Sequence, residues 1–151
     1  MNDEVIDLLN TLIVTNNDRI EGYETASEDT GDADLKVLFA QFQQTSQRCR
    51  VELVNEVRRL GGTPDEGTRF TGQVYRMWLD LKIALTHDDR KTVIDWCECG
   101  ENMASNTYQR VIHENHNDLS DQQESMLRRQ HLALKADRDK VRAMHDELTE
   151  A

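Results

Sequence analysis

Five polar side chains lie on the apolar stripes of four amphipathic stretches, at about the same height along each stretch. They are Asn16, Ser46, Cys49, Glu101 and Asp137. A buried polar group costs on the order of 1–3 kcal/mol unless it finds a partner. Such a layer inside a helical protein is therefore a site, the remains of a site, or a device that fixes the register of the helices. Its carboxylates and thiol are groups that ligate metals or share a proton.

The elements that must position this layer are predicted by apolar residues that recur three and four positions apart, as on one face of a helix. We expect long helices over four ranges, 2–29, 33–61, 89–113 and 120–148, and a shorter helix over 71–85. Gly61 and Gly62 predict the end of the second long helix, and Ser120 with Gln123 fits a capping box at the start of the fourth. Short connections join the first long helix to the second and the third to the fourth, which predicts that each of these pairs packs antiparallel. The expected fold is all-α and forms one domain over residues 1–151.

Composition limits the classes of function. The net charge of −11 opposes binding to nucleic acid or to an anionic membrane surface. No apolar stretch approaches the roughly 18 residues of a membrane span. The three cysteines form no CxxC pair and are expected as reduced thiols in a cytoplasmic protein.

The two helix pairs also share a faint internal repeat. Tyr23 follows Asn16 by seven positions, and Tyr108 follows Glu101 by the same distance. Together with the strings NNDRIEGYETA, LFAQFQQTSQRCRVELVNEVRRLGGTP and CECGENMASNTYQ, this pattern resembles the ferritin-like superfamily, especially its rubrerythrin-type helix pairs. The layout of the whole chain is most similar to an uncharacterised bacterial family of ferritin-like four-helix-bundle proteins that carry a domain of unknown function.

This resemblance implies an up-down four-helix bundle in which the short helix lies in one long crossover. Di-iron members of the superfamily use one glutamate from each first helix and a Glu-x-x-His pair from each second helix. Position by position, these ligands fall on Asn16, Ser46, Cys49, Glu101, Leu134 and Asp137. Only Glu101 keeps its residue type, and a leucine cannot ligate a metal, so the resemblance implies a degenerate di-metal site.

The leading interpretation is a non-enzymatic, stress-associated structural or interaction protein that forms a homo-oligomer, such as a dimer, and needs no cofactor. In this interpretation the polar layer fixes helix register, and Glu101 and Asp137 face each other beside Asn16 and share a proton. The alternative is a metal-binding protein or oxidoreductase whose altered site holds iron, manganese or zinc. Its candidate ligands are Glu101, Asp137, Cys97 and Cys49. A small-molecule pocket in the core or under the crossover helix is a third possibility.

Overall fold

The structure is a computed structural model that describes residues 2–68 and 72–150. Within these residues the chain forms five α-helices and no strand. The helices are α1 (Asn2–Asp29), α2 (Ala33–Arg59), α3 (Gly72–Thr86), α4 (Arg90–Glu114) and α5 (Asp121–Glu150). The expected first residue of the short helix, Thr71, lies outside the described residues.

Helix ends follow local chemistry: α1 and the start of α2 fall at the expected residues, and the other ends differ from the expected ones by one or two residues. Helix α2 ends at Arg59 rather than 61, because Gly61 takes a positive φ of 84° that breaks the helical path. At the start of α4, the side chain of Asp89 accepts a hydrogen bond from the backbone N–H of Thr92 at 3.2 Å.

The capping box that precedes α5 forms as predicted. The Ser120 hydroxyl accepts a hydrogen bond from the Gln123 backbone N–H at 3.0 Å, and the Gln123 side chain accepts one from the Ser120 backbone N–H at 2.9 Å. Two backbone donors that the helix itself leaves without partners are thereby satisfied.

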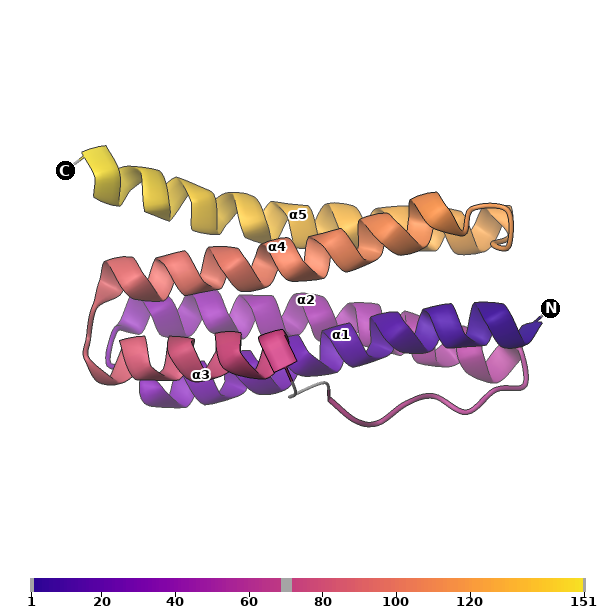
Figure 1. The fold of residues 1–151 in the computed structure, drawn as a ribbon, viewed down its shortest axis with the longest axis horizontal. Helices are drawn as coiled ribbons and strands as arrows, with labels where there is room; N and C mark the ends of the chain where they lie inside the picture. Colours follow the sequence, from indigo (N-terminus) through magenta and orange to yellow (C-terminus); the bar gives the residue numbers. More distant parts are fainter. Residues whose placement is uncertain (1, 69–71, 151) are drawn as a thin grey trace.

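The long helices associate as two antiparallel pairs that lie against each other (Figure 1). Helix α1 packs on α2, and α4 packs on α5. Across the pairs, α1 contacts α4 and α2 contacts α5. The connection after α2 returns along the outside of the molecule, so that α3 lies against α1 and α4. This topology places one face of every long helix toward a shared interior.

That interior contains two apolar clusters with buried polar groups between them. One cluster surrounds Leu9, Leu53 and Leu127, toward the end where α1 begins. The other surrounds Phe39 and the residues packed around it on α1, α2, α3, α4 and α5. The polar layer between the two clusters is buried almost completely, and its members are Asn16, Arg19, Ser46, Glu101, Gln130 and Asp137.

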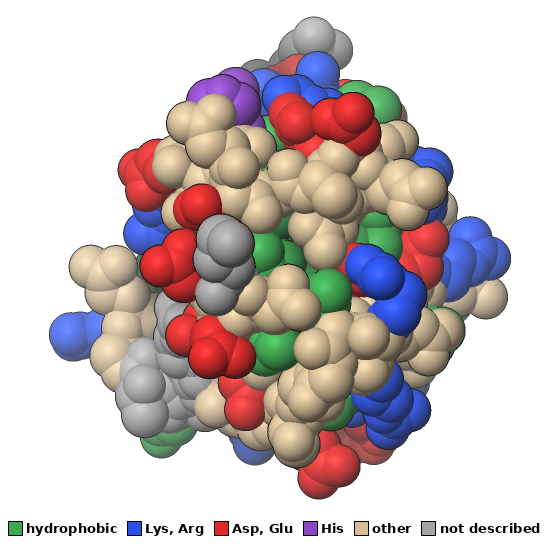
Figure 2. Space-filling model, turned by 90° about the vertical axis from the view of Figure 1, so that its right-hand side faces the viewer, with side chains coloured by type: hydrophobic (Ala, Val, Ile, Leu, Met, Phe, Trp, Pro, Cys, Tyr) green, Lys and Arg blue, Asp and Glu red, His purple; other side chains and the backbone are tan. Residues whose placement is uncertain are grey.

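The surface carries charges of both signs. Figure 2 looks at the end of the molecule where α1 begins, and it shows acidic and basic side chains spread around a small apolar centre. No helix among the described residues combines the length and apolar character needed to cross a bilayer.

Candidate functional site

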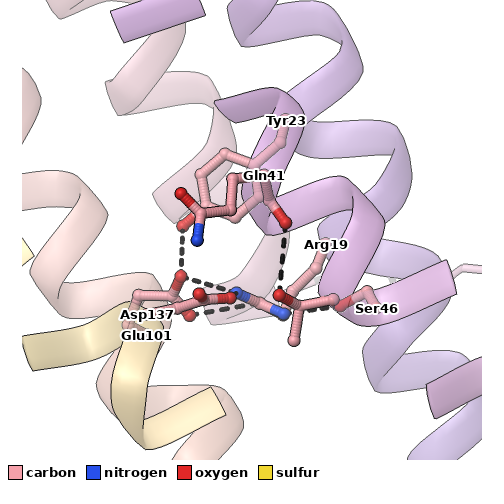
Figure 3. A network of polar contacts seen from close by, with 7 residues as sticks. Arg19, Tyr23, Gln41, Ser46, Glu101 and Asp137 are labelled. Atoms are coloured by element: carbon pink, nitrogen blue, oxygen red, sulfur yellow. Dashed lines mark hydrogen bonds and ion pairs between the residues drawn. The ribbon is translucent and has the colours of Figure 1, made fainter. Parts of the chain in front are cut away.

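An arginine that the sequence analysis missed lies at the centre of the polar layer (Figure 3). Its Nε and Nη2 atoms donate to Glu101 Oε2 and Oε1, at 3.1 and 2.7 Å. Nη2 of the same Arg19 side chain also lies 3.2 Å from Asp137 Oδ2, and its Nη1 donates to Ser46 Oγ at 2.6 Å. One guanidinium thus joins α1 to α2, α4 and α5, using the fork geometry that suits a carboxylate.

Two aromatic rings lie beside the guanidinium. Its carbon atom lies 5.6 Å from the ring centre of Tyr23 and 5.8 Å from that of Phe42, within the range of a cation–π contact. The Tyr23 hydroxyl also donates to Glu101 Oε1 at 3.1 Å. Arg19 is only 3% exposed and Glu101 only 1%, so this charge pair is withdrawn from solvent.

The cluster holds one permanent cation and two carboxyl groups. Burial lowers the pKa of Arg19, but Glu101 and Asp137 outweigh it and hold that pKa above its ordinary value, so the guanidinium stays charged. Burial raises the pKa of Glu101 and Asp137 adds to the rise, while Arg19 and Tyr23 oppose it. Uptake of one proton by Glu101 would make the three groups neutral together, and this is the direction in which burial and Asp137 shift the pKa of Glu101.

The substitution Glu101→Gln tests this proton. Between the ordinary glutamate pKa of 4.5 and the raised pKa of the folded state, the native protein binds more protons than the unfolded chain. The free energy of unfolding contributed by Glu101 is therefore fully present below 4.5 and is lost as the pH rises through the raised pKa. Glutamine does not titrate, so the free energy of unfolding of the variant should rise relative to that of the wild type as the pH rises. At neutral pH the variant should be at least as stable as the wild type.

Urea denaturation of both proteins between about pH 4 and pH 8 measures the difference. If the free energy of unfolding of the wild type instead rose relative to that of Glu101→Gln with increasing pH, pairing with Arg19 would outweigh burial and a proton on Glu101 would be excluded.

A second buried network lies next to the first and contains Asn16. The Asn16 amide nitrogen donates to the Tyr108 hydroxyl at 2.8 Å and to the Leu12 carbonyl at 2.9 Å. The Tyr108 hydroxyl donates to the Gln130 side-chain oxygen at 2.8 Å, and Gln130 reaches the Cys49 carbonyl at 3.4 Å. Asn16 was expected beside Glu101 and Asp137, but the structure places Arg19 there, one helical turn away.

The internal repeat has a counterpart in these contacts. Each first helix of a pair contributes a tyrosine that bonds to the polar residue of the other first helix: Tyr23 to Glu101, and Tyr108 to Asn16. The seven-residue spacings make α1 and α4 equivalent, and the structure joins these two helices by a reciprocal pair of hydrogen bonds.

Arg19 breaks this symmetry. It lies three residues after Asn16, and the residue three positions after Glu101 is Ala104. A small side chain at one position leaves room in the interior that the long arginine side chain at the other can fill. The sequence signal was available, because Arg19 lies three residues from Asn16 and four from Tyr23, at inward spacing.

The candidate metal ligands do not assemble into a metal site. Among the described residues, no three His, Cys, Asp or Glu side chains come together in a way that could hold an ion. Glu101 and Asp137 instead share Arg19, and Leu134 packs in an apolar cluster. An arginine cation already lies where a bridging metal would need to neutralise the carboxylates, so the residues present do not fit a di-metal cofactor.

The two buried thiols are also poor ligands. Burial raises the pKa of Cys49 to about 11, and burial together with Glu101 raises the pKa of Cys97 further. Because the thiolate is the form that ligates metal or attacks a substrate, these raised pKa values disfavour the reactive form of both cysteines at neutral pH.

A groove of about 720 Å³ lies under α3, between α1 and α4. Arg19 contributes to its wall, together with Trp78 and Met77 of α3 and Gly100 of α4. This groove is the place in the fold where the small-molecule possibility would apply, and its wall also includes His113, Glu114 and Asp18.

Comparison with known proteins gives a family. Residues 4–114 match the family model described as a domain of unknown function, DUF2383. The matched segment includes Arg19, Tyr23, Ser46 and Glu101, whereas Asp137 lies beyond it on α5. No curated protein matches the sequence. Because the match covers well over half of the chain, this protein belongs to the DUF2383 family.

Proposed function

We propose that this protein is a non-enzymatic structural or interaction module in which a buried arginine replaces the metal centre of a ferritin-like bundle. The observation that carries the proposal is the contact of Arg19 with Ser46, Glu101 and Asp137. The guanidinium supplies the positive charge and the hydrogen bonds that a metal would otherwise supply to these carboxylates. With its electrostatic requirement met from within the chain, the interior needs no cofactor.

The arrangement of the helices supports the ferritin-like part of the proposal. Two antiparallel helix pairs, joined by a long connection that contains α3, are the layout of that superfamily's bundles. The reciprocal contacts of Tyr23 with Glu101 and of Tyr108 with Asn16 fit a duplicated helix pair. The proposal that the protein acts in the bacterial cytoplasm, in connection with stress, rests on the resemblance alone.

The chemistry of the interior supports a non-enzymatic role. A catalytic site needs a group that can react or exchange a proton with a bound substrate. Here the buried carboxylates are held by Arg19, and the pKa values of Tyr23 and Tyr108 are raised far above the ordinary value, chiefly by burial. These groups hold each other in place rather than facing a substrate.

Metal analysis tests this proposal. Protein purified without a metal-affinity tag should contain far less than one equivalent of iron, manganese or zinc, and its Tm should not change when Fe²⁺ or Zn²⁺ is added. A ligand that binds the native state must stabilise it, so an unchanged Tm reports absence of binding. Arg19→Glu is the comparison, because it replaces the cation by a third carboxylate and should make Tm depend on metal.

Stoichiometric metal in the wild type, lost on Glu101→Ala, would overturn the proposal. The wild-type measurement decides this question even if the comparison variant is too unstable to purify.

A further inference from the structure

The outer face of α3 carries an apolar stripe that is about half exposed in the described chain. Tyr75, Leu79 and Ile83 follow one another at intervals of four residues and are 51%, 42% and 47% exposed. The opposite face of α3 is buried against α1 and α4 through Met77 and Leu81. Because a helix of a monomer normally turns its polar face outward, an apolar outer stripe indicates a partner.

A mainly apolar groove of about 320 Å³ runs beside this stripe, between α3 and α1. Tyr75, Trp78 and Leu79 of α3 and Ala26 of α1 contribute to its wall. The stripe and the groove therefore form one continuous apolar surface, which we call the α3 face.

Charged side chains flank the stripe in a pattern that complements itself. Arg76 and Asp80 lie on the side of the stripe toward α4, and Lys82 lies on the side toward α1. Arg76 and Asp80 are one helical turn apart, but they form no ion pair with each other or with any other described residue. Both charges are available to a partner.

We propose that the α3 face binds the α3 face of a second copy of this chain, with the two helices antiparallel about a twofold axis near Leu79. In such an isologous contact each flank of one helix faces the same flank of its partner, in reversed order. With a rise of about 1.5 Å per residue, Arg76 then lies within roughly one turn of the second copy's Asp80, and each copy contributes one such pair. On the other flank, Lys82 comes beside the second copy's Tyr75, an ammonium next to an aromatic ring.

A parallel pairing does not use these groups in the same way. About a twofold axis parallel to the helices, opposite flanks meet, so Asp80 comes within about one turn of the second copy's Lys82, while Arg76 faces no acidic side chain of α3. Only the antiparallel arrangement gives Arg76 an acidic partner on α3, so exchanging the charges at positions 76 and 80 distinguishes the two arrangements.

The size of the surface sets the expected affinity. A helix of the length of α3 spans about 22 Å, and a standard interface buries about 800 Å² from each partner. One short helix with its adjacent groove gives less than this area, so the dimer is a reversible one with a dissociation constant in the micromolar range. The inference does not depend on the Arg19 centre, which lies inside each copy.

Sedimentation equilibrium of the full chain from about 1 to 300 µM tests the dimer, because this range brackets micromolar dissociation. The wild type should pass from monomer to dimer. Leu79→Lys, which sets two cations face to face at the twofold axis, should raise the dissociation constant more than tenfold. Val37→Lys is the control, because Val37 is an apolar residue of α2 that is 69% exposed, and it should leave the dimer unchanged.

Charge exchange distinguishes this geometry from other contacts of the same face. Arg76→Asp or Asp80→Arg alone sets like charges opposite each other and should weaken the dimer several-fold, whereas the double variant should restore it. Thermal unfolding at the lowest concentration checks that each variant remains folded. A wild type that stays monomeric throughout, a dimer that Leu79→Lys does not weaken, or a double variant that fails to restore it would each overturn the proposal.

Discussion

Replacing Arg19 with alanine is expected to lower the free energy of unfolding by about 3–5 kcal/mol at neutral pH, the cost of removing one partner from a buried charge network. The substitution leaves Glu101 and Asp137 buried without their shared cation and leaves Ser46 without its donor. Without the cation, like charge and burial both raise the pKa of the Glu101 carboxyl further. The decrease in the free energy of unfolding should therefore be smaller in mild acid, where a bound proton can neutralise the carboxylate in place of the guanidinium.

Chemical denaturation at neutral and at mildly acidic pH measures both parts of this result. Arg59→Ala is the control, since Arg59 forms a well-shaped ion pair with Glu56 but lies on the surface with its side chain 63% exposed. Exposed ion pairs contribute at most about 1 kcal/mol. Equal losses in the two variants would mean that the Arg19 contacts contribute no more than a surface pair.

The second large effect is expected where α3 packs on α1. At Gly22, an added Cβ would lie 2.5 Å from the Cδ2 and Cε2 atoms of Trp78. The indole ring is rigid, so the whole side chain would have to move to relieve this contact. Gly22→Ala should destabilise the protein by about 1–3 kcal/mol, the usual cost of overpacking. Trp78 also packs edge-on against Tyr23, with ring centres 5.1 Å apart, so its displacement should disturb the tyrosine that holds Glu101.

Gly100→Ala is a matched control for this substitution. Gly100 is also a buried helical glycine under α3, but its added Cβ would meet the flexible end of Met77, at 2.9 Å from Cε. Methionine can shift its terminal methyl group, and alanine favours a helix over glycine by up to about 1 kcal/mol. Thermal unfolding should show a loss for Gly22→Ala and little change or a gain for Gly100→Ala. The reverse order would mean that Trp78 does not fix α3 in place.

The helices could be predicted from sequence because their signals are local. The spacing of apolar residues, the glycines at 61 and 62 and the capping box at 120–123 each act within a turn or two of chain. The buried stripe of α4, which includes Ile94, Cys97 and Tyr108, likewise follows from helical spacing. The exposure of Ile83 could not be read in this way, because α3 is apolar on more than one side and only its neighbours decide which side is buried.

The centre of the protein was harder to predict, and the reason is physical. A stripe drawn through Ile13 and Ile20 of α1 does not include Arg19, and arginines usually lie on the surface. In the structure Arg19 is buried and Ile20 lies at the edge of the core. An arginine can occupy a core position only if carboxylates from other helices meet it there. That condition depends on residues on α4 and α5 that are distant in sequence, so the spacing within α1 allows an inward Arg19 but cannot establish it.

The position of the charged layer between two apolar clusters also constrains how the helices can slide. A displacement of α1 by seven residues would carry Asn16 and Arg19 into an apolar cluster, at the places of Leu9 and Leu12 or of Tyr23 and Ala26. It would also bring Leu12 or Ala26 to the place of Arg19, opposite Glu101 and Asp137. Each misaligned state would bury two carboxyl groups without a counter-ion, so a single charged side chain penalises the slipped packings that a purely apolar interior would tolerate.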